Sequence, residues 1–386
     1  MIPATAPVLT PLEIASGVVL GVEEVPHDDT GGPAPDPLAA LEAAIRAGLE
    51  RPPCLVSFSG GRDSSAVLAV ATRLAEREGL PLPIPVTNAF PGAAGTDEAA
   101  WQQEVVRRLG LRDWVVNRFD DELDVVGPLA AEALRDHGLL WPFNAHFAVP
   151  LVAAAAGGTL LTGLGGDELL GASQWGRLDA VVSRRARPAP RDLLRAGLAL
   201  APTSVRAARA ARREDGTSFP WLVPAAERRV LAAWWRQSAG EPARWTRRFR
   251  WVQSVRYLRA TVRSLELIGR KDDVVVAHPF TSSAFANALA QLPRGRRFHS
   301  RAEAMRSLFG QLLPEAVLAR VSKASFDAAF FNRHSRAFVA RWDGEGTDPD
   351  LVDRDRLRGI WQSESPDARS FLLLQHVWLR KAGKTV

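Results

Sequence analysis

The segment Cys54-Leu55-Val56-Ser57-Phe58-Ser59-Gly60-Gly61-Arg62-Asp63-Ser64-Ser65 decides the fold of this chain. Its first part, residues 54–58, is uncharged and short, which is typical of a buried strand. Residues 63–78 then show apolar side chains at helical spacing. Two adjacent glycines join the two elements, so this segment predicts a strand that turns directly into a helix. Such a turn is the beginning of an α/β unit.

Strand-like and helix-like segments alternate on both sides of this turn. Helices are predicted at 37–50, 63–78, 96–109, around 127–136 and around 147–156, and strands at 54–58, 84–90, 114–119 and 159–163. This alternation predicts an α/β fold with a parallel sheet of five or a similar number of strands, flanked by helices and joined by right-handed crossovers.

The pattern becomes mainly helical beyond about residue 171, with helices predicted within 177–213, 225–268 and 281–314. We therefore expect three parts. Residues 1–35 form an N-terminal lead-in, residues 36–175 form the α/β core, and residues 176–386 form a helical part that completes the same functional unit.

Composition is that of an ordinary globular protein, with 46% hydrophobic and 24% charged residues among 386. No apolar run is long enough to cross a bilayer, and residues 1–20 lack the basic start of a signal peptide. Cys54 is the only cysteine, which excludes an internal disulfide and a cysteine-built zinc site. These features together favour a cytoplasmic protein.

The net charge is +6, and the basic residues include only four lysines, Lys271, Lys323, Lys381 and Lys384. The abundance of arginine has two interpretations. The arginines either reflect a GC-rich coding sequence or bind a negatively charged partner, which would be a nucleotide, a nucleic acid or an acidic peptide.

The glycine loop at 59–65 has the chemistry of a phosphate site. Gly60 and Gly61 allow the backbone to approach an anion closely, and the unpaired amides of the following helix favour negative charge. Serine hydroxyls add donors. Asp63 belongs beside phosphate only when a cation lies between them, so it implies Mg²⁺. The loop is neither a Walker A motif nor a G-x-G-x-x-G motif.

A second glycine-rich loop, Thr162-Gly163-Leu164-Gly165-Gly166-Asp167-Glu168-Leu169-Leu170-Gly171, follows the strand predicted at 159–163. Ligands of parallel sheets bind at the carboxyl ends of the strands, where both loops lie. A second carboxylate at this edge would help to hold the cation that Asp63 implies. Asp167 is therefore expected to lie near Asp63.

The first loop resembles the S-G-G-x-D-S signature of the PP-loop ATP pyrophosphatases, and the second resembles the S/T-G-x-G-x-D-E-x-x-G motif of their asparagine synthetase branch. The resemblance covers roughly residues 36–335 and implies an adenine nucleotide α-hydrolase-like fold, ATP and Mg²⁺ as cofactors, and cleavage between the α- and β-phosphates.

The resemblance also implies roles for particular residues. Asp63 and Asp167 would bind the metal, with Asp167 also catalytic and Glu168 a weaker metal candidate. Adenine would lie near Phe58 and residues 86–90, where Asn88 either contacts the nucleoside or forms a turn. The residues implied to hold the nucleotide are Phe58, Ser59, Gly60, Gly61, Asp63, Ser64, Ser65, Asn88 and Gly165.

Two further segments are similar to the family. Residues 320–326 resemble its R-x-x-K-x-x-F segment, which implies that Lys323 is catalytic and stabilises charge on the acyl-adenylate or on pyrophosphate. His278-Pro279-Phe280 resembles its x-P-F segment. The sequence departs from the family there, because Val275 and Ala277 replace an acid and a base. Leu164 lies where β-lactam synthetase places a polar catalytic group.

The first hypothesis for function is an ATP-dependent, AMP-forming carbon–nitrogen ligase. Residue 2 is Ile2 rather than a nucleophilic cysteine, so no glutaminase domain is expected. The amine would then be free ammonia, the product of a separate glutaminase, or part of a substrate, as in relatives that close β-lactams or lasso peptides. The carboxylate belongs to a small molecule or a peptide, with a peptide-binding partner as a further option.

Two alternatives stay open. An RNA-modifying PP-loop enzyme would fit the pI of about 10.3, although sulfur transfer needs cysteines and nucleic acid is therefore disfavoured. A degenerate nucleotide-binding subunit would fit the changes at Leu164, Val275 and Ala277.

Overall fold

The computed structural model describes residues 6–25, 35–91, 99–212, 216–319 and 327–383. At its centre is a five-stranded parallel sheet in the order β3-β2-β1-β4-β5. The strands are β1 (Cys54–Ser57), β2 (Ile84–Ala89), β3 (Val115–Arg118), β4 (Thr159–Leu161) and β5 (Val275–Ala277). The α/β class and the parallel sheet predicted from sequence are confirmed.

Helices cover both faces of this sheet, and the central strands β1 and β4 are the most deeply buried. Cys54 and Val56 of β1 point into a core formed with α2 (Pro37–Leu49), α3 (Arg62–Glu78) and α14 (Ser283–Ala290). Leu55 points into a second cluster, formed with α6 (Val149–Ala154) and α13 (Arg256–Gly269). The uncharged character of residues 54–58 follows from this burial on two faces.

Local signals set the ends of the sheet's helices. The Asp36 side chain accepts a hydrogen bond from Leu38 N at 3.1 Å and caps α2, whose first residue is Pro37. The helix α3 ends at Gly79, whose φ of +67° is the left-handed conformation that favours glycine. The remaining helices of this region are α4 (Ala99–Arg108) and α5 (Pro128–His137).

The fifth strand comes from the part of the chain where we predicted helices. β5 pairs with β4 in the register Thr159↔Val275 and Leu161↔Ala277. A strand of three residues is too short to show the alternation of apolar and polar side chains that identifies a strand in a sequence. Only its pairing with β4 identifies it. The helical half therefore contributes directly to the sheet edge that bears the second loop.

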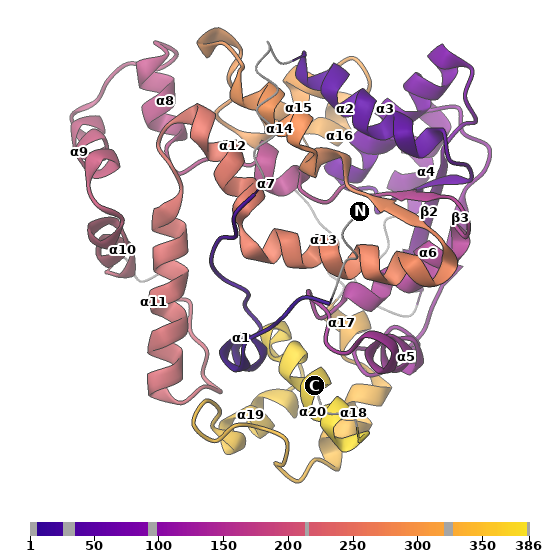
Figure 1. Cartoon of the computed structure of the whole chain (residues 1–386), viewed down its shortest axis with the longest axis vertical. Coiled ribbons are helices and arrows are strands. Elements are labelled where there is room, and N and C mark those ends of the chain that lie inside the picture. The colour runs from indigo at the N-terminus through magenta and orange to yellow at the C-terminus, as the bar shows by residue number, and fades with distance from the viewer. Residues whose placement is uncertain (1–5, 26–34, 92–98, 213–215, 320–326, 384–386) are drawn as a thin grey trace.

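The rest of the chain is helical, as predicted. Figure 1 shows α8–α10 along one edge of the molecule and α18–α20 at the end farthest from α2 and α3. None of the helices in the described segments is long and apolar enough to span a membrane. The remaining helices are α1 (Pro11–Ser16), α7 (Gly166–Leu170), α8 (Gly176–Val182), α9 (Pro190–Leu200), α10 (Thr203–Ala211), α11 (Pro224–Gly240), α12 (Trp245–Ser254), α15 (Arg301–Phe309), α16 (Glu315–Leu318), α17 (Asp327–Phe330), α18 (Arg333–Ala340), α19 (Arg354–Trp361) and α20 (Phe371–Lys381).

Candidate active site

The first glycine loop has the geometry of an anion cradle. Gly60 has φ +77°, and Gly61 begins α3 without a side-chain cap. The loop is held from within, because Gly61 N donates to Ser59 Oγ at 3.3 Å and Ser64 Oγ donates to Gly61 O at 3.1 Å. Trp101 Nε1 of α4 donates a hydrogen bond to Gly60 O at 2.9 Å and so holds the loop from outside. The amides at the start of this seventeen-residue helix therefore have the arrangement that favours binding of an anion such as phosphate.

The second loop packs directly on the first, and its glycines make this contact possible. A Cβ at Gly166 would lie 2.4 Å from Asp63 Cγ, and a Cβ at Gly163 would lie 2.8 Å from Ser64 N. Gly165 has φ +92°, and a Cβ there would lie 2.6 Å from Thr281 Cγ2. A side chain at Gly163 or Gly166 would separate the two loops, and one at Gly165 would collide with Thr281.

This packing brings the two predicted carboxylates to one place. Arg301, the first residue of α15, donates from Nη2 to Asp63 Oδ2 at 2.6 Å and pairs through Nη1 with Asp167 Oδ1. Asp63 and Arg301 are each 16% exposed, and Asp167 is 46% exposed at the mouth of the site. One cation therefore contacts both carboxylates. Arg301 was missed from sequence because it is one arginine among many.

The arrangement fits a magnesium ion that is bound together with a nucleotide. In the described residues no group of three or more histidine, cysteine, aspartate or glutamate side chains could hold a metal alone. Mg²⁺ is usually bound by one or two carboxylates together with substrate phosphates. Asp63 and Asp167, which lie beside the anion cradle, would be such a pair.

A buried arginine holds the short helix that carries Asp167. Arg248 of α12 is 5% exposed and donates to Glu168 O and Leu169 O at 3.1 Å each and to Gly171 O at 2.9 Å. Its charge is paired with Glu241 Oε1 at 3.2 Å. These bonds satisfy the free carbonyls at the end of α7 and fix its direction. No motif or pattern in the sequence singles out Arg248 as a residue of the site.

Histidine 278 fixes the start of the second loop. Its Nδ1 lies 2.6 Å from Thr162 Oγ1, which also accepts a hydrogen bond from Leu164 N at 3.3 Å. Burial lowers the pKa of His278 to about 4, so the ring is neutral near pH 7. Burial also lowers the pKa of His146 to about 4, and its ring contacts the carbonyls of Phe143 and Leu123. Both histidines are packed within the fold.

These two histidines are expected to make folding stability depend on pH. The unfolded chain takes up protons near pH 6.5, whereas the folded state keeps both rings neutral down to about pH 4. Stability should therefore fall between pH 6.5 and 4, by up to about 1.4 kcal/mol per pH unit for each histidine. Urea unfolding of His278→Asn and His146→Asn at several pH values should show a shallower slope than the parent. Equal slopes would contradict the buried neutral state.

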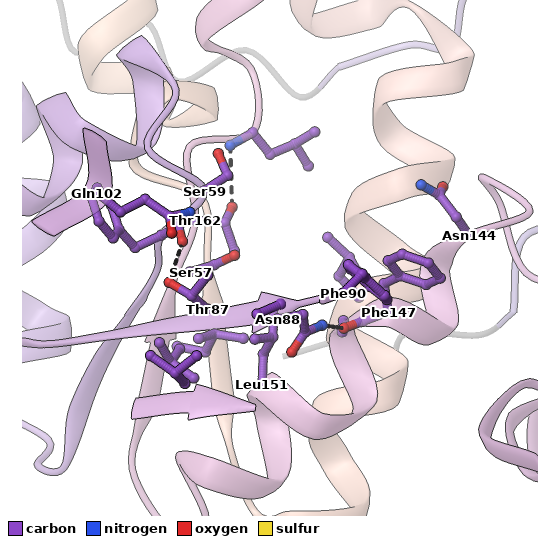
Figure 2. A pocket seen from close by; sticks show the side chains of 18 of the residues that line it. Ser57, Ser59, Thr87, Asn88, Phe90, Gln102, Asn144, Phe147, Leu151 and Thr162 are labelled. Carbon is purple, nitrogen blue, oxygen red and sulfur yellow. Dashed lines mark hydrogen bonds between the residues drawn. The ribbon is translucent and has the colours of Figure 1, made fainter. Parts of the chain in front are cut away.

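A cavity of about 700 Å³ opens beside the two loops. Figure 2 shows Ser59 and Thr162 on one side of it and Phe90, Phe147 and Asn144 on the other. A volume of this size accommodates a nucleoside and a further small group. Arg118, exposed at the end of β3, is the one charged side chain among the described residues that line it.

The predicted nucleoside residues both line this cavity. Phe58 is 1% exposed and packs edge-on against Trp114 at 6.4 Å between ring centroids. Asn88 Nδ2 donates to Phe147 O at 2.8 Å, and Asn88 Oδ1 accepts from Asn117 at 3.3 Å. Asn88 therefore fixes the cavity wall, while Phe58 is packed in the core that borders the cavity.

The remaining predicted residues fall into four groups. Ser59, Gly60, Gly61 and Ser64 form the first loop as described above. Ser65 is fully buried, and its Oγ has no hydrogen-bond partner within the described residues. Glu168, the weaker metal candidate, accepts a hydrogen bond from the Tyr257 hydroxyl at 3.4 Å. Lys323 lies outside the described residues, as does the rest of the segment 320–326.

Fold and site together define an α/β nucleotide-binding enzyme with a phosphate loop and a paired-carboxylate loop. The family model for asparagine synthase matches residues 38–380, so the chain belongs to the asparagine synthase family. This is a family of ATP-dependent carbon–nitrogen ligases, and the match extends well into the helical half. No significant match was found among curated proteins.

Proposed function

We propose that this protein is an AMP-forming ligase that adenylates a substrate carboxylate and passes the acyl group to an amine or to ammonia. The observation that carries the proposal is the meeting of Asp63 and Asp167 at one cation, beside the amides that begin α3. The family match supports ATP use and carbon–nitrogen ligation in general.

The first step joins the acid to the α-phosphate. A carboxylate oxygen attacks the α-phosphorus, the bond to the β-phosphate bridging oxygen breaks, and pyrophosphate leaves. The α3 amides and the loop serines bind the leaving phosphates, and Arg301 lies within reach of their charge. Asp63 and Asp167 would hold Mg²⁺, which neutralises the triphosphate when bound. Lys323 is proposed to add positive charge at the same place.

The second step forms the amide. The amine nitrogen attacks the acyl carbon, AMP leaves with the electron pair of the acyl–oxygen bond, and the nitrogen loses a proton. The protein contributes chiefly by positioning the reactants and excluding water, because the cavity walls are largely apolar. We place the reaction in the cytoplasm, with the amine delivered as ammonia, by a separate glutaminase, or on a peptide or small-molecule substrate.

The cavity also favours one kind of acid. Free aspartate carries an ammonium group and a second carboxylate, and each needs an oppositely charged partner when removed from water. Among the described residues that line the cavity, only Arg118 is charged, and it is exposed at the β3 edge. We therefore propose an acid whose remainder is uncharged and apolar, such as an acyl chain or a peptide side chain.

Exchange of labelled pyrophosphate into ATP tests this proposal. We expect exchange to require an added acid, to be supported by apolar acids or peptides, and to be at least about tenfold slower with aspartate. Product analysis should find AMP rather than ADP. Formation of ADP and phosphate would contradict adenylation. Absence of exchange with every acid, together with salt-sensitive tRNA binding, would support RNA modification instead.

A further inference from the structure

The edge of the molecule formed by α8, α9 and α10 exposes an unusual amount of apolar side chain. Nine large hydrophobic residues are exposed in the described part of the chain, and five of them lie between residues 182 and 205. Leu193 is 78% exposed and Leu200 is 88% exposed. A concentration of this kind marks an interaction site more often than chance. Figure 1 shows these helices along one side, away from the sheet.

Helix α9 is oriented with its polar side inward. Asp192 is the only buried residue of α9, and it pairs with Arg177 Nη2 at 3.0 Å and with Arg195 Nη1 at 2.9 Å. It also accepts a hydrogen bond from Ala189 N at 2.9 Å. The bonds to Arg195 and Ala189 lie within α9 and its N-cap, whereas the bond to Arg177 of α8 crosses between helices and keeps the Asp192 side of α9 against α8. Leu193, Leu194 and Leu200, at positions i, i+1 and i+7, consequently share the outward side.

The same segment carries free positive charge. Residues 176–212 contain nine arginines and two aspartates, a net charge of +7, whereas the whole chain has +6. Both aspartates are already paired, Asp179 with Arg297 and Asp192 as described above. The guanidinium groups of five arginines have no hydrogen-bond or ion-pair partner among the described residues: Arg184, Arg187, Arg191, Arg209 and Arg212. A biased coding sequence would account for arginines but not for exposed leucines.

From these observations we propose that α8–α10 form a docking surface for an acidic amphipathic helix of another protein or peptide. Leucine-type side chains of that helix would pack on Leu193, Leu194 and Leu200, and its carboxylates would pair with the free arginines. A second copy of this chain is disfavoured because two surfaces of +7 repel. A membrane is disfavoured because residues 176–212 contain none of the aromatic residues that anchor interfacial helices.

A labelled helical peptide probe tests the docking surface on the full chain. The probe has leucine at i, i+3, i+4 and i+7 and glutamate elsewhere, and a matched probe has lysine in place of glutamate. Fluorescence anisotropy is expected to show binding of the glutamate probe that weakens with salt, and no binding of the lysine probe.

Two variants and one control locate the contact. The triple variants Leu193→Ser/Leu194→Ser/Leu200→Ser and Arg184→Gln/Arg187→Gln/Arg191→Gln should each weaken binding at least about tenfold. The control Val8→Ser, at an 82% exposed valine elsewhere, should bind as the parent does. These side chains are exposed, so the variants should fold like the parent, and circular dichroism checks this.

Unchanged binding in the leucine variant would overturn the proposal. So would leucine-dependent attachment to phosphatidylglycerol vesicles, or leucine-dependent self-association, in the absence of peptide binding. The outcome does not depend on the ligase chemistry.

Discussion

Replacing Asp63 or Asp167 by asparagine is expected to lower ATP–pyrophosphate exchange by about a thousandfold or more. Each substitution removes one of the two carboxylates that meet beside the phosphate loop while it preserves the side-chain volume. Loss of one metal-binding charge at a reacting phosphate costs several kcal/mol of transition-state stabilisation, and about 4 kcal/mol corresponds to that factor.

The control for this experiment is Asp350→Asn, which alters an exposed aspartate in a distant loop. Exchange by the control should equal that of the parent protein. The double variant Asp63→Asn/Asp167→Asn should be no slower than the more damaged single variant, because both carboxylates act on one ion. Exchange within tenfold of the parent in either single variant would refute the assignment.

Substitution of Arg301 by methionine is expected to make folding stability depend on Mg²⁺. Arg301 contacts Asp63 and Asp167, so its removal leaves two neighbouring carboxylates without their shared cation. The loss should be about 1–3 kcal/mol, which is smaller than for a fully buried pair because Asp167 is 46% exposed. A divalent ion can then take the position between the carboxylates, and millimolar Mg²⁺ should restore part of the lost stability.

Urea unfolding with and without Mg²⁺ measures this effect without any need for substrate. The parent protein and Arg301→Lys, which keeps the positive charge, should respond to Mg²⁺ less than Arg301→Met does. Exchange activity should also fall in Arg301→Met if the guanidinium assists the leaving pyrophosphate. Equal stabilisation of all three proteins by Mg²⁺ would contradict a cation site shared by Asp63 and Asp167.

The elements with a strong local pattern could be predicted from the sequence. The strand–loop–helix unit at 54–78 has a buried strand, two glycines and an amphipathic helix, and each feature is set by neighbouring residues. The second loop could be placed beside it because parallel strands carry their loops at the same edge. The structure brings Asp63 and Asp167 to one guanidinium, as that reasoning requires.

The missed features depend on tertiary contacts. β5 is three residues long and is recognisable only by its pairing with β4. Arg301 and Arg248 act through partners more than seventy residues away, and arginine is too common in this chain to single them out. In α9 it is Asp192, paired with Arg177 of α8, that is buried, while Leu193, Leu194 and Leu200 are exposed. The local sequence pattern cannot show which face of this helix is buried.

Binding of Mn²⁺ in the presence of the α,β-methylene analogue of ATP is the most direct measurement of the central claim. Mn²⁺ replaces Mg²⁺ at oxygen sites, and its electron paramagnetic resonance signal reports the bound fraction. The parent protein should bind Mn²⁺ only when the analogue is present, and Asp63→Asn and Asp167→Asn should each weaken that binding at least about tenfold. Unchanged Mn²⁺ affinity in both variants would show that the two carboxylates do not share a nucleotide-bound metal ion.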